Sequence, residues 1–293
     1  MTIQFRNQNT ISKSVSVQGV GYWSGLEASV EFRPAAPDTG IIFVRADISG
    51  QPRIAVQPEN CVDIPRRTCI QSGSACVEMI EHLMAALAGL QIDNCEIWVD
   101  RAEVPAFDGS CIEVVEKLQS VDLVSQPISK PTFVIEEEIR LEADGCWIAA
   151  YPHQTRSNNL TLTYQLDYEA AVIGQQEIEL VVTPDAFKKE LASARTFLLE
   201  VEAEWLRSQG LGRNVSFSDL LVFGPEGLIG NTLRYSDECV RHKALDAVGD
   251  LAVAGFDIAG HVVAHKSGHR VNGLFVKKLV DAFDASQGKR LSA

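Results

Sequence analysis

The chain has 293 residues, of which 46% are hydrophobic and 22% are charged. This balance is typical of a globular protein and excludes disordered and collagen-like classes. The length favours two domains of similar size. The formal net charge of −13 argues against a nucleic-acid partner, because counterion release requires clustered Lys and Arg.

The N-terminal segment reads MTIQFRNQNT and lacks an apolar stretch typical of a signal peptide. No window approaches the roughly 18 apolar residues that a membrane-spanning helix needs. We therefore expect a cytoplasmic protein without a transmembrane segment. Seven cysteines, an odd number without CxxC spacing, predict reduced and mostly structural thiols.

The first half of the chain begins with β-rich runs separated by turn clusters. Residues 10–63 alternate such runs, and we expect antiparallel strands there. Residues 77–90 carry apolar side chains at helical spacing, with Gly89 in a position suited to a C-cap, and predict a helix. Residues 95–99 predict the strand that follows it.

A polar segment with two prolines, residues 124–131, lies near the midpoint of the chain and predicts an interdomain linker. The expected domains are therefore residues 1–126 and 132–293. Beyond the linker the pattern restarts, with strand-like runs at 132–135, 147–150 and 160–166. The strongest helix of this half is predicted at 238–254.

The two strong predicted helices superpose at a constant offset of 160 residues, which pairs His82 with His242 and Gly89 with Gly249. A repeat of this kind indicates an internal duplication, although the match is short enough for chance to remain an alternative. We expect an α+β fold of two similar domains. Each would be a β-sheet layered with helices, and the two would pack face to face.

A candidate metal site emerges from the same two helices. His242 and Asp246 are spaced i, i+4 and project from one helix face, and Asp250 extends the row. Taken alone, this spacing is more often a surface hydrogen-bonded pair. His82 strengthens the metal interpretation, because it follows Glu81 in an otherwise apolar helix, where packing has little use for an acid and an imidazole. The alternative for His82 is a buried histidine with satisfied hydrogen bonds. A catalytic zinc needs three such ligands and an open position.

Another histidine cluster, residues 264–269, follows the apolar run 258–263. We expect a strand that ends in a Gly-containing turn, which would present an imidazole to a cleft. His261 and His265 lie in the predicted strand and are interpreted as structural, and His153 as solvated.

Several motifs occur in a fixed order over nearly the whole chain. They are Gly19 to Gly21, Glu81 to Asn94, Glu103 to Ser110, Ser193 to Phe197, Arg241 to Leu251 and Lys266 to His269. Together they resemble the zinc-dependent UDP-3-O-acyl-N-acetylglucosamine deacetylases, which catalyse the committed step of lipid A synthesis. The resemblance implies an active site between two domains and zinc ligands at His82, His242 and Asp246. Fe²⁺ suits this ligand set nearly as well.

The resemblance also implies catalytic roles for four further residues. Glu81 would be the general base and Thr196 would donate to the oxyanion. His269 would protonate the leaving amine, and Asp250 would orient it. For Asp250 the alternative is an ordinary solvated helix face.

Three substrate contacts follow from the same resemblance. Lys243 would contact polar groups of the substrate, and Phe197 would pack against the sugar or the acyl chain. Asp108 would be a substrate contact, although it is as readily a turn-forming residue. Without a role in binding, Lys243 would lie on a solvated helix face and Phe197 would be a core residue.

The chain departs from the family pattern around the predicted acyl-chain passage. It has Tyr22 and Trp23 where the family usually has Leu-His, Leu198 and Leu199 after the Thr-Phe pair, and residues 212–216 in place of a glycine-rich segment. The expected partner is a UDP-linked acylated amino sugar, bound by a monomer. Two alternatives stay open: an amidohydrolase of another N-acetylated sugar or nucleotide-linked amide, and a non-catalytic paralogue.

Overall fold

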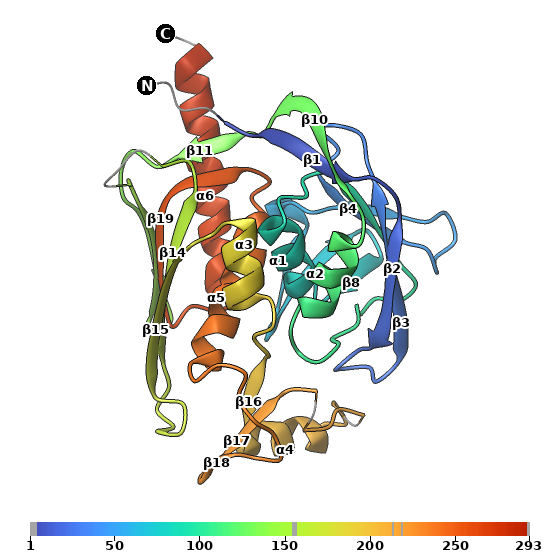
Figure 1. Cartoon of the computed structure of the whole chain (residues 1–293), viewed down its shortest axis with the longest axis vertical. Helices are drawn as coiled ribbons and strands as arrows, with labels where there is room; N and C mark the ends of the chain where they lie inside the picture. The colour runs from blue at the N-terminus through green and yellow to red at the C-terminus, as the bar shows by residue number, and fades with distance from the viewer. Residues whose placement is uncertain (1–4, 154–156, 213, 218, 292–293) are drawn as a thin grey trace.

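A computed structural model describes residues 5–153, 157–212, 214–217 and 219–291. Two large β-sheets form the outer layers, and helices fill the space between them (Figure 1). Each large sheet is built from one half of the chain. The predicted α+β class with two similar halves is confirmed.

The sheet of the first half has the strand order β2-β3-β9-β4-β5. These strands span Val15–Val20 (β2), Glu27–Pro34 (β3), Cys95–Val99 (β9), Ile41–Arg45 (β4) and Arg53–Ala55 (β5). In β3 every second side chain is buried, so that Val30 and Phe32 face the helices. This period of two is what places one apolar face of the sheet on the core.

The sheet of the second half has the order β12-β13-β19-β14-β15, with β11 pairing β19 as well. The strands span Ile139–Ala143 (β12), Cys146–Tyr151 (β13), Asp257–His265 (β19), Leu160–Asp167 (β14), Gln175–Val181 (β15) and Thr132–Val134 (β11). In both sheets the central strand, β9 or β19, is antiparallel to one neighbour and parallel to the other. The shared order and directions support the duplication expected from the repeat.

The central helices of the two halves, α1 (Glu81–Gly89) and α5 (Glu238–Ala252), pack against each other between the sheets. A Cβ atom at Gly249 of α5 would lie 2.1 Å from the carbonyl oxygen of Glu81. Only glycine allows this separation, because real Cβ atoms do not approach backbone so closely. Gly89 has an equivalent function toward Phe187, whose ring lies 2.2 Å from the ideal Cβ position. The repeated glycines therefore set how closely the helices approach their neighbours.

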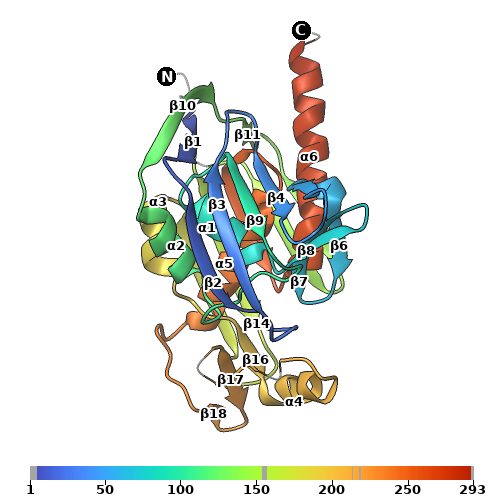
Figure 2. The same ribbon diagram turned by 90° about the vertical axis from the view of Figure 1, so that its right-hand side faces the viewer.

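Each half carries a small three-stranded sheet inserted before its central helix. The insert of the first half is β6 (Cys61–Ile64), β7 (Arg67–Ser72) and β8 (Ala75–Glu78). The insert of the second half is β16 (Phe197–Leu199), β17 (Leu221–Gly224) and β18 (Gly227–Leu228), together with α4 (Glu200–Ser208). This second insert lies apart from the main layers, at the bottom of Figures 1 and 2.

The remaining elements complete the layers. They are β1 (Asn7–Ile11), η1 (Pro58–Asn60), α2 (Ile112–Gln119), β10 (Leu123–Ser129), α3 (Pro184–Ala186), η2 (Phe187–Leu191) and α6 (His269–Leu291). The long helix α6 extends beyond the body of the molecule toward the C-terminus (Figure 2). No helix in the described part of the chain is long and apolar enough to cross a membrane.

The structure corrects several predicted elements. Most of the expected linker belongs to strand β10. Its backbone groups form hydrogen bonds with β1, which lies far away in the sequence. Residues 77 and 78 end strand β8 instead of opening the helix, since their apolar pattern fits both elements. The antiparallel strands expected within residues 10–63 are confirmed, since β2 pairs β3 and β4 pairs β5 in this way, and the later strand β9 adds a parallel pair with β4. His269 does not lie in a turn; it is the first residue of α6. The domain boundaries at 126 and 132 stay a prediction.

Candidate metal centre and active site

A cavity of about 660 Å³ lies where the two halves and both inserts meet. Its polar end includes Glu81, His82, His242, Lys243, Asp246 and His269. Its apolar wall is supplied largely by the second insert and the segment around it, with Leu198, Ala203, Leu206, Leu211, Val215, Phe217, Leu220 and Val222. Reactive groups and a long apolar surface thus share one cavity.

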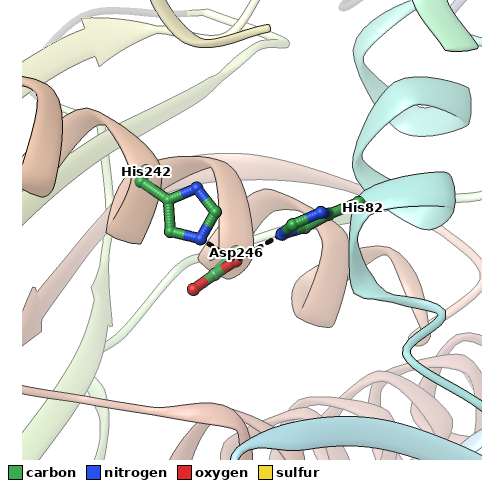
Figure 3. Close-up of side chains that lie close together, drawn as sticks. All are labelled: His82, His242 and Asp246. Carbon is green, nitrogen blue, oxygen red and sulfur yellow. Dashed lines mark ion pairs between the residues drawn. The ribbon is translucent and has the colours of Figure 1, made fainter. Parts of the chain in front are cut away.

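His82, His242 and Asp246 converge at the polar end of this cavity (Figure 3). Asp246 Oδ1 lies 3.5 Å from His82 Nε2 and 3.3 Å from His242 Nε2. The three ligand atoms lie within 4.8 Å of one another, and all three residues are buried. His82 comes from α1, whereas the other two come from successive turns of α5. The i, i+4 pair and the distant histidine are therefore brought together as the sequence predicted.

The state of these side chains fits a divalent metal. His242 Nδ1 donates a 3.0 Å hydrogen bond to the carbonyl of Ala194, which leaves Nε2 as the free acceptor. Burial lowers the pKa of His242 to about 3, so the imidazole is neutral. Asp246 Oδ1 is buried without a hydrogen-bond donor among the described residues. A buried oxygen of this kind needs a partner, and a cation held by these three residues would supply one.

Asp246 remains ionised in this buried position. Burial raises the pKa of its carboxyl, but His242 and Lys243 outweigh this and hold the pKa well below its usual value. Lys243 Nζ donates to Asp246 Oδ2 at 2.8 Å and leaves Oδ1 directed at the imidazoles. Burial lowers the pKa of Lys243, but the same carboxylate outweighs burial and raises that pKa. Lys243 also lines the cavity, with its ammonium 5.9 Å from the ring centre of Phe197.

Glu81 is the first residue of α1 and lies beside the candidate ligand His82. Its side chain is 3% exposed, and its Oε2 accepts a 2.9 Å hydrogen bond from the backbone N–H of Thr68. Burial raises the pKa of Glu81 above its usual value. A carboxylate with a raised pKa and an open path to the cavity suits proton abstraction near neutral pH.

His269 faces Glu81 across the cavity, with Nε2 3.9 Å from Glu81 Oε1. Its Nδ1 lies 2.9 Å from Asp250 Oδ2, as predicted from the pairing of the two residues. Burial lowers the pKa of His269, but the carboxylates of Asp250 and Glu81 raise it to about 10. The imidazole is therefore cationic, with Nε2 available as a proton donor. Asp250 itself does not line the main cavity and contacts it only through His269.

Thr196 and Phe197 both line the cavity. The Thr196 hydroxyl makes no hydrogen bond within the described part of the chain, and its backbone is fixed by Gly109 and Leu221. Phe197 is 5% exposed and packs edge-on against His242, with ring centres 6.4 Å apart. The core and cavity roles of Phe197 are therefore compatible, because the same ring packs in the core and lines the cavity.

Asp108 lies outside the residues that line the cavity. Its Oδ1 accepts hydrogen bonds from the backbone and hydroxyl of Ser110, and its Oδ2 pairs with Arg234 at 2.6 Å. These contacts are those of a turn-forming residue. Its role as a substrate contact stays a prediction.

Comparison with known proteins identifies the family of the chain. The family model described as UDP-3-O-acyl N-acetylglycosamine deacetylase matches residues 8–281. The chain belongs to this deacetylase family. Similar proteins named UDP-3-O-acyl-N-acetylglucosamine deacetylase occur in Oleidesulfovibrio alaskensis, with 35% identity over 93% of this chain and 88% of the relative, and in Bdellovibrio bacteriovorus, with 36% identity over 94% and 90%. A relative of the same name in Brucella ovis is 36% identical over 93% of this chain and 95% of its own length.

Sequence reasoning missed other residues of this deacetylase site. Arg66, Arg207 and Arg270 line the cavity. Arg66 also pairs with Glu202 of α4 at 2.9 Å and so joins the two inserts. Thr68 contacts the side chains of both Glu81 and Asp250. No local pattern marks these residues, since contacts between elements distant in sequence place the three arginines at the cavity and Thr68 beside Glu81 and Asp250.

Proposed function

We propose that this protein hydrolyses the N-acetyl amide of a UDP-3-O-acyl-N-acetylglucosamine and releases acetate, as a step of lipid A biosynthesis. The observation that carries the proposal is a buried His-His-Asp group at one end of a cavity whose other wall is apolar. Membership of the deacetylase family supports this reaction over another amide hydrolysis.

The cofactor we propose is Zn²⁺, with Fe²⁺ as the other ion that this donor set suits. His82, His242 and Asp246 would hold it. Bound there, the ion would polarise the amide carbonyl and lower the pKa of the attacking water. Neutral imidazoles and an ionised carboxylate are the protonation states that such an ion requires.

Glu81 removes a proton from the attacking water in this scheme. Its buried position and raised pKa support that role, because the base must also hold the proton until the amine departs. Thr196 donates its unpaired hydroxyl to the oxyanion of the tetrahedral intermediate. An uncommitted donor at the cavity wall loses no existing hydrogen bond when it does so.

His269 gives its Nε2 proton to the nitrogen of the leaving amine. Asp250 on the other ring nitrogen keeps the imidazole cationic and fixes its orientation. The water thus loses one proton to Glu81, the amine gains one from His269, and the carbon–nitrogen bond breaks. Acetate and the free amino sugar are the products.

The cavity walls support the substrate assignment. The apolar wall from α4 and its neighbours suits the acyl chain, and Phe197 lies between this wall and the ligand His242. Lys243, Arg66 and Arg270 line the cavity but are each paired with a carboxylate, whereas Arg207 also lines it and forms no salt bridge with the described residues. Arg207 is therefore the cation best placed to contact an anionic diphosphate.

Acetate release from purified protein tests this function. The substrate is UDP-3-O-acyl-N-acetylglucosamine, and UDP-N-acetylglucosamine without the acyl chain is the comparison. We expect turnover of the acylated substrate, loss of turnover with a chelator, and much slower turnover of the unacylated sugar. Equal rates on the two sugars would refute the role of the apolar wall, and no acetate from either would refute the proposed reaction.

A further inference from the structure

One residue of the first insert contacts the acid and base residues from both halves of the chain. Thr68 lies in β7, next to the start of α1 and opposite the C-terminal part of α5. It does not line the main cavity. It lines a smaller cavity of about 90 Å³, which Asp250 and His269 also line. Thr68 therefore acts on the site only through other residues.

The backbone of Thr68 fixes the start of α1. Its carbonyl accepts a 3.1 Å hydrogen bond from the N–H of Ile80, and its own N–H donates to Glu81 Oε2 at 2.9 Å. The second bond holds one carboxylate oxygen, so the other oxygen, Oε1, is directed toward His269. The orientation of the proposed base thus depends on the position of β7.

The side chain of Thr68 fixes the partner of the proposed acid. Its hydroxyl donates to Asp250 Oδ1 at 2.5 Å and lies 3.2 Å from His269 Nδ1. Asp250 Oδ2 accepts from His269 Nδ1 and from Asn272 Nδ2 at 2.9 Å and 2.8 Å. The carboxylate is therefore held by Thr68 on one oxygen and by His269 and Asn272 on the other.

We propose that Thr68 is a positioning residue of the deacetylation reaction, which sets the distance and orientation between Glu81 and His269 by holding both from behind. This inference rests on the proposed function, since it assigns the two proton-transfer roles to those residues. Its physical basis is that proton transfer to and from one reacting amide requires both groups in fixed geometry. Thr68 joins elements of both halves, and neither half fixes this geometry alone.

The test compares Thr68→Ser with Thr68→Ala. Both variants lose the methyl group, and they differ only in the hydroxyl that Asp250 accepts. We expect kcat of the Ala variant to fall about tenfold to a hundredfold below that of the Ser variant, the range typical for loss of an outer hydrogen-bonding partner of an active-site residue. KM and bound metal should be the same in both, because Thr68 touches neither substrate nor ligand.

Thr163→Val is the matched control. The Thr163 hydroxyl also bonds a carboxylate and a histidine, Glu179 at 2.9 Å and His261 at 2.8 Å, but it lies in β14 away from the cavity. Its removal should leave kcat unchanged. Equal kcat for the Ser and Ala variants of Thr68 would overturn the proposal, and so would a loss confined to KM or to melting temperature. An inactive wild-type protein would instead refute the proposed function.

Discussion

The two halves of the chain share one topology but contribute different chemistry. At the offset of 160 residues, His82 corresponds to His242, and both belong to the candidate metal group. The neighbouring position differs: Glu81 faces the cavity, whereas Arg241 forms ion pairs with Asp237 and Glu190. The duplicated helix pair thus supplies the scaffold, and the proposed mechanism assigns the reaction to positions where the halves differ.

The remaining differences follow the same rule. Ala86 of the first half corresponds to Asp246, and Leu90 corresponds to Asp250. In the proposed mechanism the second half therefore adds a carboxylate ligand and the partner of His269, while the first half adds the base. A metal at this site would be held by both halves together. The inserts differ as well, because the first supplies Thr68 and the second an apolar wall.

The largest effect is expected where the halves differ most. Glu81→Ala should lower the deacetylation rate by at least about a hundredfold, because the water loses its base, while metal content is retained. Arg241→Ala at the equivalent position is the control, and it should keep near-normal turnover. Acetate release measures the turnover of each variant, and elemental analysis measures its metal content. Near-normal turnover of the Glu81 variant would show that Glu81 is not the general base.

Metal content tests the contribution of each half. His82→Ala and Asp246→Ala should both lower bound metal, since each removes one of three ligands from a different half. His261→Ala is a suitable control, because this histidine bonds Thr163 outside the cavity. Unchanged metal in the Asp246 variant would show that the second half supplies a different ligand.

Arg6 joins the halves away from the site. Its guanidinium pairs with Asp93 at 2.6 Å and with Asp257 at 2.7 Å. Burial raises the pKa of Asp93, but the hydrogen bonds from Arg6 and the charge of Lys130 outweigh it and lower the pKa. We expect Arg6→Ala to lower the free energy of unfolding at pH 7 by about 2 kcal/mol.

This stability difference should depend on pH. A carboxyl with a lowered folded-state pKa stabilises the protein above its unfolded pKa of about 3.9, and the contribution is lost as pH falls through the folded-state value. The difference between wild type and the Arg6 variant should therefore stay constant from pH 7 to about pH 5 and shrink below about pH 4. Denaturant titrations at these pH values measure it. A difference that grows on acidification contradicts the ion-pair account.

The smallest effect concerns the insert of the second half. Ala203 of α4 lines the cavity, and Ala203→Leu adds bulk to the apolar wall without disfavouring the helix. We expect kcat/KM for long acyl chains to fall about tenfold relative to short ones. Val201→Leu is the control on the same helix, since Val201 is 68% exposed. An equal loss of kcat/KM for all acyl-chain lengths would show that α4 does not contact the acyl chain.

Much of this architecture can be predicted from local pattern. The sequence predicts strand β9 with its observed bounds, because turn residues precede its short apolar run. Helical spacing and family resemblance together predict His82, His242 and Asp246 as one group, and they do converge. Local periodicity and turn chemistry determine the strand and the two helices, whereas the grouping of the three residues as metal ligands follows from the family resemblance.

What could not be predicted depends on contacts distant in sequence. Residues 124–129 look like a linker, and only the unpaired edge of β1 makes them a strand. Val77 suits strand or helix equally, and pairing with β7 decides between them. Thr68 has no sequence signal at all, because its role follows from the crossing of α1 and α5 beside β7.

In the proposed mechanism, one metal held by both halves supports amide hydrolysis. The most direct measurement adds Zn²⁺ stepwise to metal-free protein and follows acetate release from UDP-3-O-acyl-N-acetylglucosamine. We expect negligible release without metal and a rise that saturates at one equivalent per chain. Full activity in the metal-free protein, or saturation only at two equivalents, would contradict it.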